Sequence, residues 1–215
     1  MKHFSIAILF LLPLLGAAQT KKDLPQLLKQ GNLEVYHRRI SEAPANEKPA
    51  VYLDGDEGEG IAWIKGQKFS EGTIEVDLKG KDVFQKSFLG IAFHGQNDST
   101  YDAIYFRPFN FRTTDSVRRI HAVQYIAHPT YPWKKLRDEQ NGKYEKAVEP
   151  APDPNQWFHA RILIEANNVS VYVNNKKEPV LSVQKLNNRS SGKIGLWVGD
   201  GADGSFANLI IKEKK

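Results

Sequence analysis

The middle of the sequence concentrates side chains that are suited to holding a polar ligand. They are aromatic rings and planar hydrogen-bonding groups, namely His94, Tyr105, Arg107, Asn110, Arg112, Gln124 and Trp133. Flat rings stack on the apolar faces of a ligand, and guanidinium and amide groups form paired hydrogen bonds with its polar groups. We therefore predict that these residues, apart from Arg112, form a ligand-binding site.

Three of these residues have a second interpretation. Arg107 would either present its guanidinium on the surface as a fork for ligand oxygens or anchor a loop through a buried carboxylate. Gln124 lies in a segment that is apolar on both faces, and we expect it to point outward because a buried amide needs several partners. His94 would be either a ligand contact or a structural hydrogen-bond donor.

The loop Asp200-Gly201-Ala202-Asp203-Gly204 is a candidate metal site. Short loops of this composition bring carboxylate and carbonyl oxygens together, which suits calcium. Asp-Gly pairs are also common turn formers. Asp200 and Asp203 are therefore predicted either to bind a structural calcium ion or to form a turn, and no other cofactor is predicted.

No motif identifies a catalytic centre. The sequence contains no His-Glu-x-x-His, no Gly-x-Ser-x-Gly and no phosphate-binding loop. The catalytic residues are therefore not predicted.

The segments that must position these residues alternate between apolar and polar residues. In Thr73–Leu78, for example, Ile74, Val76 and Leu78 share one face. Further segments of this kind are Leu33–Ile40, Ala50–Leu53, Ile61–Ile64, Phe88–His94, Ala103–Phe109, His121–Ala127, Phe158–Glu165, Asn168–Asn174, Val180–Val183, Lys193–Val198 and Phe206–Lys212. Because strands do not alternate with helices, the sequence predicts an all-β fold of two packed antiparallel sheets.

The alternation also assigns side chains to faces. It places Ile104 and Phe106 in the core, with Tyr105 and Arg107 on the opposite face. In the preceding strand it places His94 on the face that carries small residues, which would leave room for a ligand. Trp197 is predicted to project away from its apolar neighbours, either stacking on a ligand or, as we prefer, capping the sheet.

Composition and charge set the class of protein. The chain has 215 residues, of which 40% are hydrophobic and 26% charged, as in globular domains. Its net charge of +5 is modest, and the basic residues are dispersed among acidic ones. We therefore expect no nucleic-acid partner. The oligomeric state is not predicted.

The N-terminus predicts export. Lys2 precedes the apolar run Phe4–Leu15, and Gly16-Ala17-Ala18 supplies small residues, as in a signal peptide covering residues 1–18. The apolar run is too short to span a membrane. With no cysteine, the chain is expected to be secreted or periplasmic in a bacterial envelope. Residues 19–30 are predicted to be a polar lead with a short helix, followed by one domain over residues 31–215.

A long proline-rich segment, residues 129–156, interrupts the strands and includes a charged, helix-forming stretch from Trp133 to Gln140. Loops of this length in a compact domain commonly carry function. The alternative is a packed insertion that covers a sheet edge.

Several segments together resemble a known superfamily. They are Gly72-Thr-Ile-Glu-Val-Asp-Leu, Phe88-Leu-Gly-Ile-Ala-Phe, Trp157-Phe-His-Ala-Arg-Ile, Val171-Tyr-Val-Asn and Gly192-Lys-Ile-Gly-Leu-Trp-Val. In order and spacing they resemble the concanavalin A-like lectin/glucanase jelly roll over roughly residues 55–212. Within it, the chain is similar to laminin G-like and 3-keto-disaccharide hydrolase-like domains of secreted bacterial proteins.

The resemblance implies a jelly roll that holds a carbohydrate on its concave sheet, beneath the 129–156 loop. The first alternative to carbohydrate binding is a glycoside-cleaving hydrolase or lyase. In such an enzyme, Arg107 and His94 would work with a loop acid such as Asp138, Glu139 or Glu145. The second alternative is a structural or adhesion module that binds protein.

One mechanism of the superfamily is not supported by the sequence. Laminarinase-type glucanases carry their paired acids on one strand as Glu-x-Asp-x-Glu, whereas this chain has Glu75, Asp77 and then Lys79. Glycoside hydrolysis needs two carboxyl groups across the scissile bond. The lysine removes the second acid, so Glu75 and Asp77 are predicted to lie on a solvated strand face.

Overall fold

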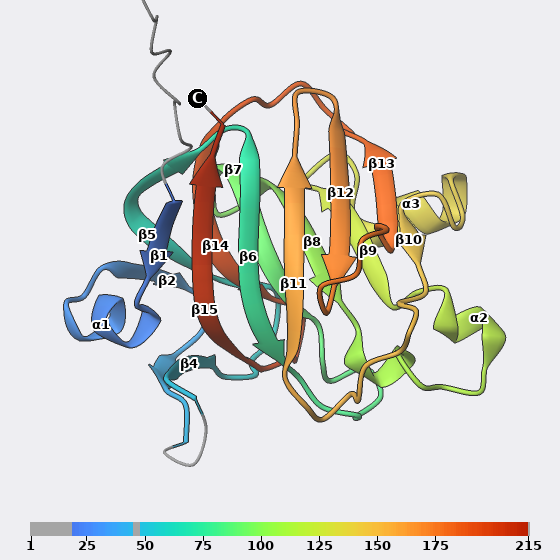
Figure 1. Cartoon of the computed structure of the whole chain (residues 1–215), viewed down its shortest axis with the longest axis horizontal. Coiled ribbons are helices and arrows are strands. Elements are labelled where there is room, and N and C mark those ends of the chain that lie inside the picture. Colours follow the sequence, from blue (N-terminus) through green and yellow to red (C-terminus); the bar gives the residue numbers. More distant parts are fainter. Residues whose placement is uncertain (1–18, 45–47, 215) are drawn as a thin grey trace, which may run out of the picture.

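The computed structural model describes residues 19–44 and 48–214, whose strands form two antiparallel sheets packed face to face (Figure 1). The strands are β1 (Gln19–Lys22), β2 (Leu33–Tyr36), β3 (Ile40–Glu42), β4 (Ala50–Leu53), β5 (Gly60–Phe69), β6 (Gly72–Lys79), β7 (Leu89–Asn97), β8 (Thr100–Phe106), β9 (Val123–Ala127), β10 (Glu145–Lys146), β11 (Phe158–Ile164), β12 (Asn168–Val173), β13 (Leu181–Gln184), β14 (Gly192–Val198) and β15 (Gly204–Glu213). The helices are α1 (Leu24–Lys29), η1 (Pro108–Asn110), α2 (Ser116–Arg119) and α3 (Trp133–Glu139).

Strands that lie side by side in a sheet are often far apart in the chain. The eight-stranded sheet has the order β13-β12-β11-β6-β15-β4-β3, and β1 also pairs with β15. The seven-stranded sheet has the order β10-β9-β8-β7-β14-β5-β2. This arrangement confirms the predicted two-sheet antiparallel sandwich. Among the described residues, no helix is long and apolar enough to cross a membrane.

Alternation along the strands builds the core between the sheets. In β6, Ile74, Val76 and Leu78 are fully buried, and every second residue between them is partly exposed. The ring of Phe106 in the seven-stranded sheet packs against the ring of Phe158 in the eight-stranded sheet, with the ring centroids 5.0 Å apart. Burial of each such large side chain stabilises the fold by about 1.5–3 kcal/mol.

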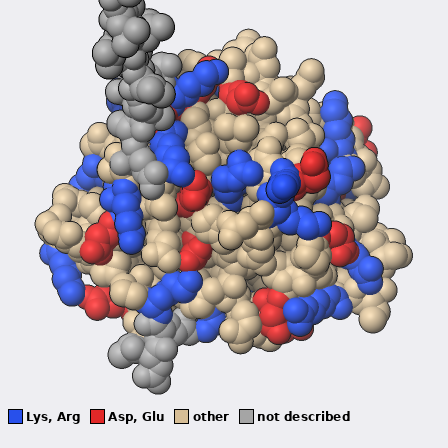
Figure 2. All heavy atoms as spheres, in the orientation of Figure 1, with Lys and Arg blue, Asp and Glu red and all other residues tan. Residues whose placement is uncertain are grey.

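The outer face of β6 carries ion pairs. Glu75 accepts from Lys212 at 2.7 Å, and Asp77 accepts from Lys48 at 2.7 Å and contacts His159 at 2.8 Å. Burial alone would raise the pKa of Asp77, but hydrogen bonds from His159 and Lys48 outweigh it and lower the pKa. On this face of the molecule, basic and acidic side chains are interspersed (Figure 2). The charges of Glu75 and Asp77 are therefore neutralised by neighbouring cations, and both residues lie on the outer face of the strand, as was predicted for them.

The segment of residues 19–30, predicted to precede the domain, is part of it. Strand β1 pairs with β15 in the register from Gln19 opposite Lys212 to Lys22 opposite Leu209. The side chain of Asp23 then caps α1 by accepting from the backbone N–H of Gln26 at 3.0 Å. Helix α1 buries Leu24 against the core. The predicted signal peptide, residues 1–18, lies outside the described residues.

The long segment of residues 129–156 extends the seven-stranded sheet. Helix α3 packs beside β9 through the buried side chain of Leu136. Strand β10 then pairs with β9, with Glu145 opposite Gln124. The segment therefore covers a sheet edge, as in the second of the two interpretations given above, and it carries Trp133 and Arg137 toward the outer face of the sheet.

Candidate functional site

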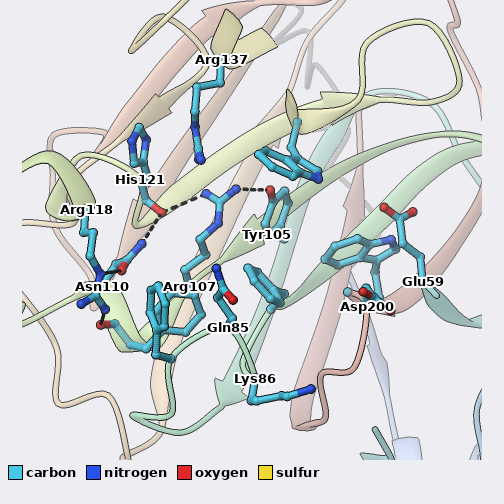
Figure 3. Close-up of a pocket in the computed structure, with 16 residues that line it drawn as sticks. Glu59, Gln85, Lys86, Tyr105, Arg107, Asn110, Arg118, His121, Arg137 and Asp200 are labelled. Carbon is cyan, nitrogen blue, oxygen red and sulfur yellow. Dashed lines mark hydrogen bonds between the residues drawn. The ribbon is translucent and has the colours of Figure 1, made fainter. Parts of the chain in front are cut away.

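A cavity of about 500 Å³ opens on the outer face of the seven-stranded sheet (Figure 3). Its aromatic lining comes from two strands, one loop and the short helices η1 and α3, and consists of Phe84, Phe88, Tyr105, Phe109, Trp133 and Trp197. Its polar lining includes arginines, carboxylates and amides, some of them from further loops and from α2. We refer to this cavity below as the pocket.

Strand register places the floor of the pocket. Gly90 in β7 lies opposite Tyr105 in β8 and opposite Trp197 in β14, so the two rings flank it on the same face. The ring centroids of Tyr105 and Trp197 are 4.8 Å apart. A Cβ at Gly90 would lie 2.0 Å from the carbonyl oxygen of Ile104, so only glycine fits at this point of the sheet. In the structure, Tyr105 and Trp197 lie on the strand faces that the alternation predicted.

Trp197 was expected to cap the sheet rather than to contact a ligand. Its indole Nε1–H donates to the hydroxyl of Tyr101 at 3.2 Å, and the residue is only 2% exposed. The ring nevertheless forms part of the pocket wall. Trp197 is therefore buried, as a residue that caps the sheet would be, and it also lines the pocket, so its stacking on a ligand stays a prediction.

Arg107 is a buried anchor and not an exposed fork. The residue is 4% exposed. Its guanidinium donates to the backbone oxygen of His121 at 2.9 Å, to Oε1 of Gln124 at 2.5 Å, and to the hydroxyl of Tyr105. Of the two interpretations of Arg107, the structure shows the loop anchor. Its guanidinium still forms part of the pocket wall.

Glu145 supplies the buried carboxylate of this cluster. Its Oε2 lies 3.7 Å from Nη1 of Arg107 and 2.7 Å from Nδ1 of His121. Arg137 donates to both carboxylate oxygens, from Nε at 3.1 Å and from Nη2 at 2.8 Å. Burial lowers the pKa of Arg107 and raises that of Tyr105 to about 12. Tyr105 is therefore protonated at neutral pH, and its hydroxyl donates to Gln124 at 2.7 Å.

Gln124, Asn110 and Trp133 take different positions around this cluster. Gln124 shares the outward face of Tyr105, as predicted, but β10 and α3 bury it completely, so it lies behind the pocket wall. Asn110 lines the pocket and accepts from Nε of Arg118 at 3.3 Å. Trp133 stands at the mouth, 43% exposed, with the Arg137 guanidinium 5.1 Å from its ring.

His94 does not reach the pocket, contrary to the face that alternation predicted. The residue has a φ of 51°, and the pairing of β7 with β8 shifts register after Phe93. This irregularity turns the imidazole into the interior, where Nε2 contacts the backbone oxygen of Ser70 at 2.7 Å. His94 therefore has a structural role, which was the second interpretation of this residue.

The neighbour of His94 in the interior is a buried carboxylate, Asp102. Its oxygens accept from Asn187 at 2.7 Å, from the Tyr125 hydroxyl at 3.0 Å and from Nε of Arg189 at 3.2 Å. Nδ1 of His94 lies 3.7 Å from Oδ2. Burial alone would raise the pKa of Asp102, but the nearby His94 and the hydrogen bonds from Arg189 and Asn187 outweigh burial and lower the pKa.

Two carboxylates, Glu59 and Asp200, line the side of the pocket away from Arg107 (Figure 3). Glu59 accepts from the Tyr101 hydroxyl and lies 3.3 Å from Nε2 of His128. Burial would raise its pKa, but the contacts with His128 and Tyr101 outweigh burial and lower the pKa. Oδ1 of Asp200 accepts from the backbone N–H of Gly58 at 2.7 Å. Glu59 is therefore ionised at neutral pH.

The predicted calcium ligands have other partners. Asp203 pairs with Lys81 at 2.5 Å and accepts from the Tyr52 hydroxyl at 2.9 Å, whereas Asp200 faces Gly58 and the pocket. Within residues 19–44 and 48–214, no three His, Asp or Glu side chains are grouped so that they could hold a metal ion. Calcium binding by Asp200 and Asp203 therefore stays a prediction.

Several residues of the pocket were not predicted to belong to it. They come from loops and short helices, and include Glu59, Phe84, Phe88, Arg118, His121 and Arg137. No periodic pattern marks such residues. The nearest signal was the long segment of residues 129–156, in which Arg137 follows Trp133 by one helical turn.

The sequence matches one family over most of its length. The family is described as the 3-keto-alpha-glucoside-1,2-lyase-like domain, and it matches residues 34–212. This match confirms the resemblance drawn from the strand motifs. No curated protein sequence matches the chain.

Solved structures share the fold at low sequence identity. The carbohydrate binding module CBM66 from Bacillus subtilis has 14% identity and a TM-score of 0.59, over 83% of this chain and 93% of that one. A Bacillus subtilis protein with a galectin-like fold has 11% identity and a TM-score of 0.63, over 92% and 96%. The exoplasmic/lumenal domain of VIP36 in its metal-free form has 12% identity and a TM-score of 0.52, over 83% and 85%. These similarities concern the fold, which is the predicted jelly-roll sandwich.

Proposed function

Because this chain belongs to the 3-keto-alpha-glucoside-1,2-lyase-like domain family, we propose that it binds a saccharide in the pocket on the outer face of the seven-stranded sheet. The observation that carries the proposal is the combination of stacking rings with fixed hydrogen-bonding groups in one cavity. Tyr105 and Trp197 form the floor and Trp133 the mouth, while Asn110 and the arginines lie between them. Sugars present flat C–H faces and hydroxyl groups, and such a cavity matches both.

Two further observations support the proposal. The structure of a protein named as a carbohydrate binding module shares the fold over most of both chains. The predicted signal peptide supports export to a compartment where extracellular saccharides are met. The protein would then act in the periplasm or outside the cell.

Replacing Trp133 with alanine is expected to weaken saccharide binding about 5- to 30-fold, which corresponds to about 1–2 kcal/mol. The fold should be little affected, because Trp133 is 43% exposed at the mouth of the pocket. The measurement is a glycan array, followed by titration of the best ligand and by an assay for released reducing ends on the same panel.

The matched control is Trp157→Ala. Trp157 is also partly exposed, but it packs under Lys48, which pairs with Asp77 on the eight-stranded sheet. This variant should bind saccharide as the unmodified chain does. Equal losses in the two variants, or full binding by Trp133→Ala, would place the ligand elsewhere.

Lyase action on a 3-keto glycoside is the second candidate function, and the observation that favours it is Glu59. In such a reaction a base removes the proton at C2, which the neighbouring C3 ketone makes acidic. The bond from C1 to the glycosidic oxygen breaks, a C1–C2 double bond forms, and the leaving oxygen takes up a proton. Glu59 is an ionised carboxylate in the pocket wall, so it can accept the C2 proton. The guanidinium groups across the pocket would stabilise the negative charge that develops on the ketone oxygen.

If Glu59 is this base, Glu59→Gln should slow release of the leaving group from a 3-keto glucoside by about 100-fold or more, with little change in binding. Glutamine preserves the shape of the side chain and keeps one acceptor oxygen for Tyr101 or His128. The control is Glu57→Gln, which removes an exposed carboxylate that does not line the pocket. Release measured by chromatography at an unchanged rate in Glu59→Gln would exclude Glu59 as the base.

A further inference from the structure

The charges of the pocket are separated along its length (Figure 3). Arg107, Arg118 and Arg137 lie together at one end, with His121 beside them. The carboxylates that line the pocket, Glu59 and Asp200, lie at the other end. Lys86 also lines the pocket, next to Gly201, so a ligand that spans the pocket meets three guanidinium groups at one end, and two carboxylates and one ammonium group at the other.

The guanidinium end holds more positive charge than its own carboxylate can balance. Glu145 faces both Arg107 and Arg137 and also the imidazole of His121. Both of its oxygens accept from Arg137, and Oε2 also faces Arg107 and His121, so one carboxylate already serves two guanidinium groups. Burial lowers the pKa of His121, and the charges of Arg137 and Arg107 lower it further against the opposing effect of Glu145.

Arg118 is the guanidinium that lacks a counter-charge. Its Nε donates to Oδ1 of Asn110 at 3.3 Å and its Nη2 donates to the backbone oxygen of Phe109 at 3.2 Å. Its remaining neighbour is the ring of Phe84, 4.3 Å from Cζ. The ion pairs seen among the described residues do not include Arg118, whereas Glu145 pairs with both Arg107 and Arg137.

We infer that the pocket selects a saccharide that carries a carboxylate, a uronic acid, and that Arg118 binds this carboxylate. The inference rests on the proposed function and specifies its ligand class. A carboxylate supplies the missing counter-charge, and its two oxygens match the planar fork of a guanidinium. The sugar hydroxyls would then donate toward Glu59 and Asp200 at the opposite end, while its C–H face lies on the aromatic floor.

The test compares two sugars that differ only at C6, methyl α-D-glucuronoside and methyl α-D-glucoside. We expect the glucuronoside to bind at least about tenfold more tightly at low salt, because a charge-assisted hydrogen bond is added. The difference should shrink as sodium chloride is added, since ions screen the interaction in an open pocket. Titrations followed by two-dimensional NMR give both dissociation constants on the same protein.

Three variants tie the preference to Arg118. Arg118→Gln should lose the preference for the glucuronoside while its affinity for the glucoside changes little, and Arg118→Lys should keep part of the preference. The control is Arg119→Gln on the same helix. The Arg119 guanidinium contacts only the backbone oxygen of Thr113, at 3.3 and 3.1 Å, and does not line the pocket. The variant Arg119→Gln removes one positive charge, as Arg118→Gln does, and should keep the preference for the glucuronoside. Thermal melting of each variant checks that it is folded.

The outcomes separate the inference from the proposed function. Equal affinity for the two sugars, or a preference that survives in folded Arg118→Gln, would overturn the inference and leave saccharide binding in place. A preference lost equally in Arg119→Gln would assign it to overall charge and would also overturn the role of Arg118. If neither sugar binds and the glycan array is blank as well, both the inference and the proposed function fail.

Discussion

Replacing Arg107 with alanine is expected to lower the free energy of unfolding by about 3 kcal/mol. The guanidinium is buried and donates to His121, Gln124 and Tyr105, so its removal leaves three acceptors short of a donor and opens a cavity. The loss is at the lower end of the range for buried ion pairs because Arg137 still pairs with Glu145. For a chain of this length, the melting temperature should fall by roughly 6–12 °C.

Calorimetric melting and urea unfolding measure this effect. The exposed control is Arg112→Ala, which removes a surface ion pair with Asp153 and should cost less than about 1 kcal/mol. Combining Arg107→Ala with Glu145→Gln should cost less than the sum of the two single substitutions, because each removes part of the same contact. A variant Arg107→Ala that is as stable as Arg112→Ala would contradict the buried-anchor role.

Asp102→Asn is expected to destabilise the protein by about 3 kcal/mol at pH 7 and by much less in acid. The carboxylate is completely buried and accepts from Asn187, Tyr125 and Arg189. Its pKa is lowered in the folded state, whereas an unfolded aspartate titrates near about pH 3.9. Its contribution to stability is therefore present above about pH 4 and is lost as the pH falls through its folded pKa.

Urea unfolding of the unmodified chain and of Asp102→Asn at a series of pH values tests this prediction. The two stabilities should differ most at neutral pH and converge below about pH 4. Asp138→Asn is the control, because Asp138 pairs with Lys134 on the exposed face of α3. It should cost less than about 1 kcal/mol at pH 7. A difference between Asp102→Asn and the unmodified chain that does not change with pH would show that folding does not lower the pKa of Asp102.

Strand alternation predicted most of the fold because neighbouring strands keep a regular register. Tyr105 and Arg107 were placed opposite Ile104 and Phe106, and the structure agrees, since β8 pairs with β7 and β9 without a shift at these residues. The predicted end of this strand was too late. Pro108 cannot donate to a ladder, and a 3₁₀ turn begins there.

His94 shows the limit of that reasoning. A single residue with positive φ, together with a register shift, moves every later side chain of a strand to the opposite face. Nothing in the residue types around His94 marks the shift. Its partner Asp102 is adjacent only because β7 and β8 pair, so the buried cluster could not be read from either segment alone.

The composition of the pocket was only partly predictable for a similar reason. Tyr105, Arg107, Asn110 and Trp133 were singled out by type and spacing, and the structure brings all four to one cavity. Glu59 and the arginines at positions 118 and 137 reach it from an inter-strand loop and two short helices. Their approach depends on how those connections pack on the sheet, which a one-dimensional pattern does not contain.

The central claim, that a saccharide occupies the pocket on the outer face of the seven-stranded sheet, is tested most directly by the four tryptophans of the chain. Trp133 and Trp197 line the pocket, whereas Trp63 and Trp157 do not. Their indole N–H signals are resolved by two-dimensional NMR of ¹⁵N-labelled protein and assigned with single Trp→Phe variants. Addition of a saccharide identified on the array should shift the Trp133 and Trp197 signals in a saturable way and leave that of Trp157 in place. Saturable shifts of Trp157 with Trp133 and Trp197 unchanged would place the ligand outside the pocket and contradict the account.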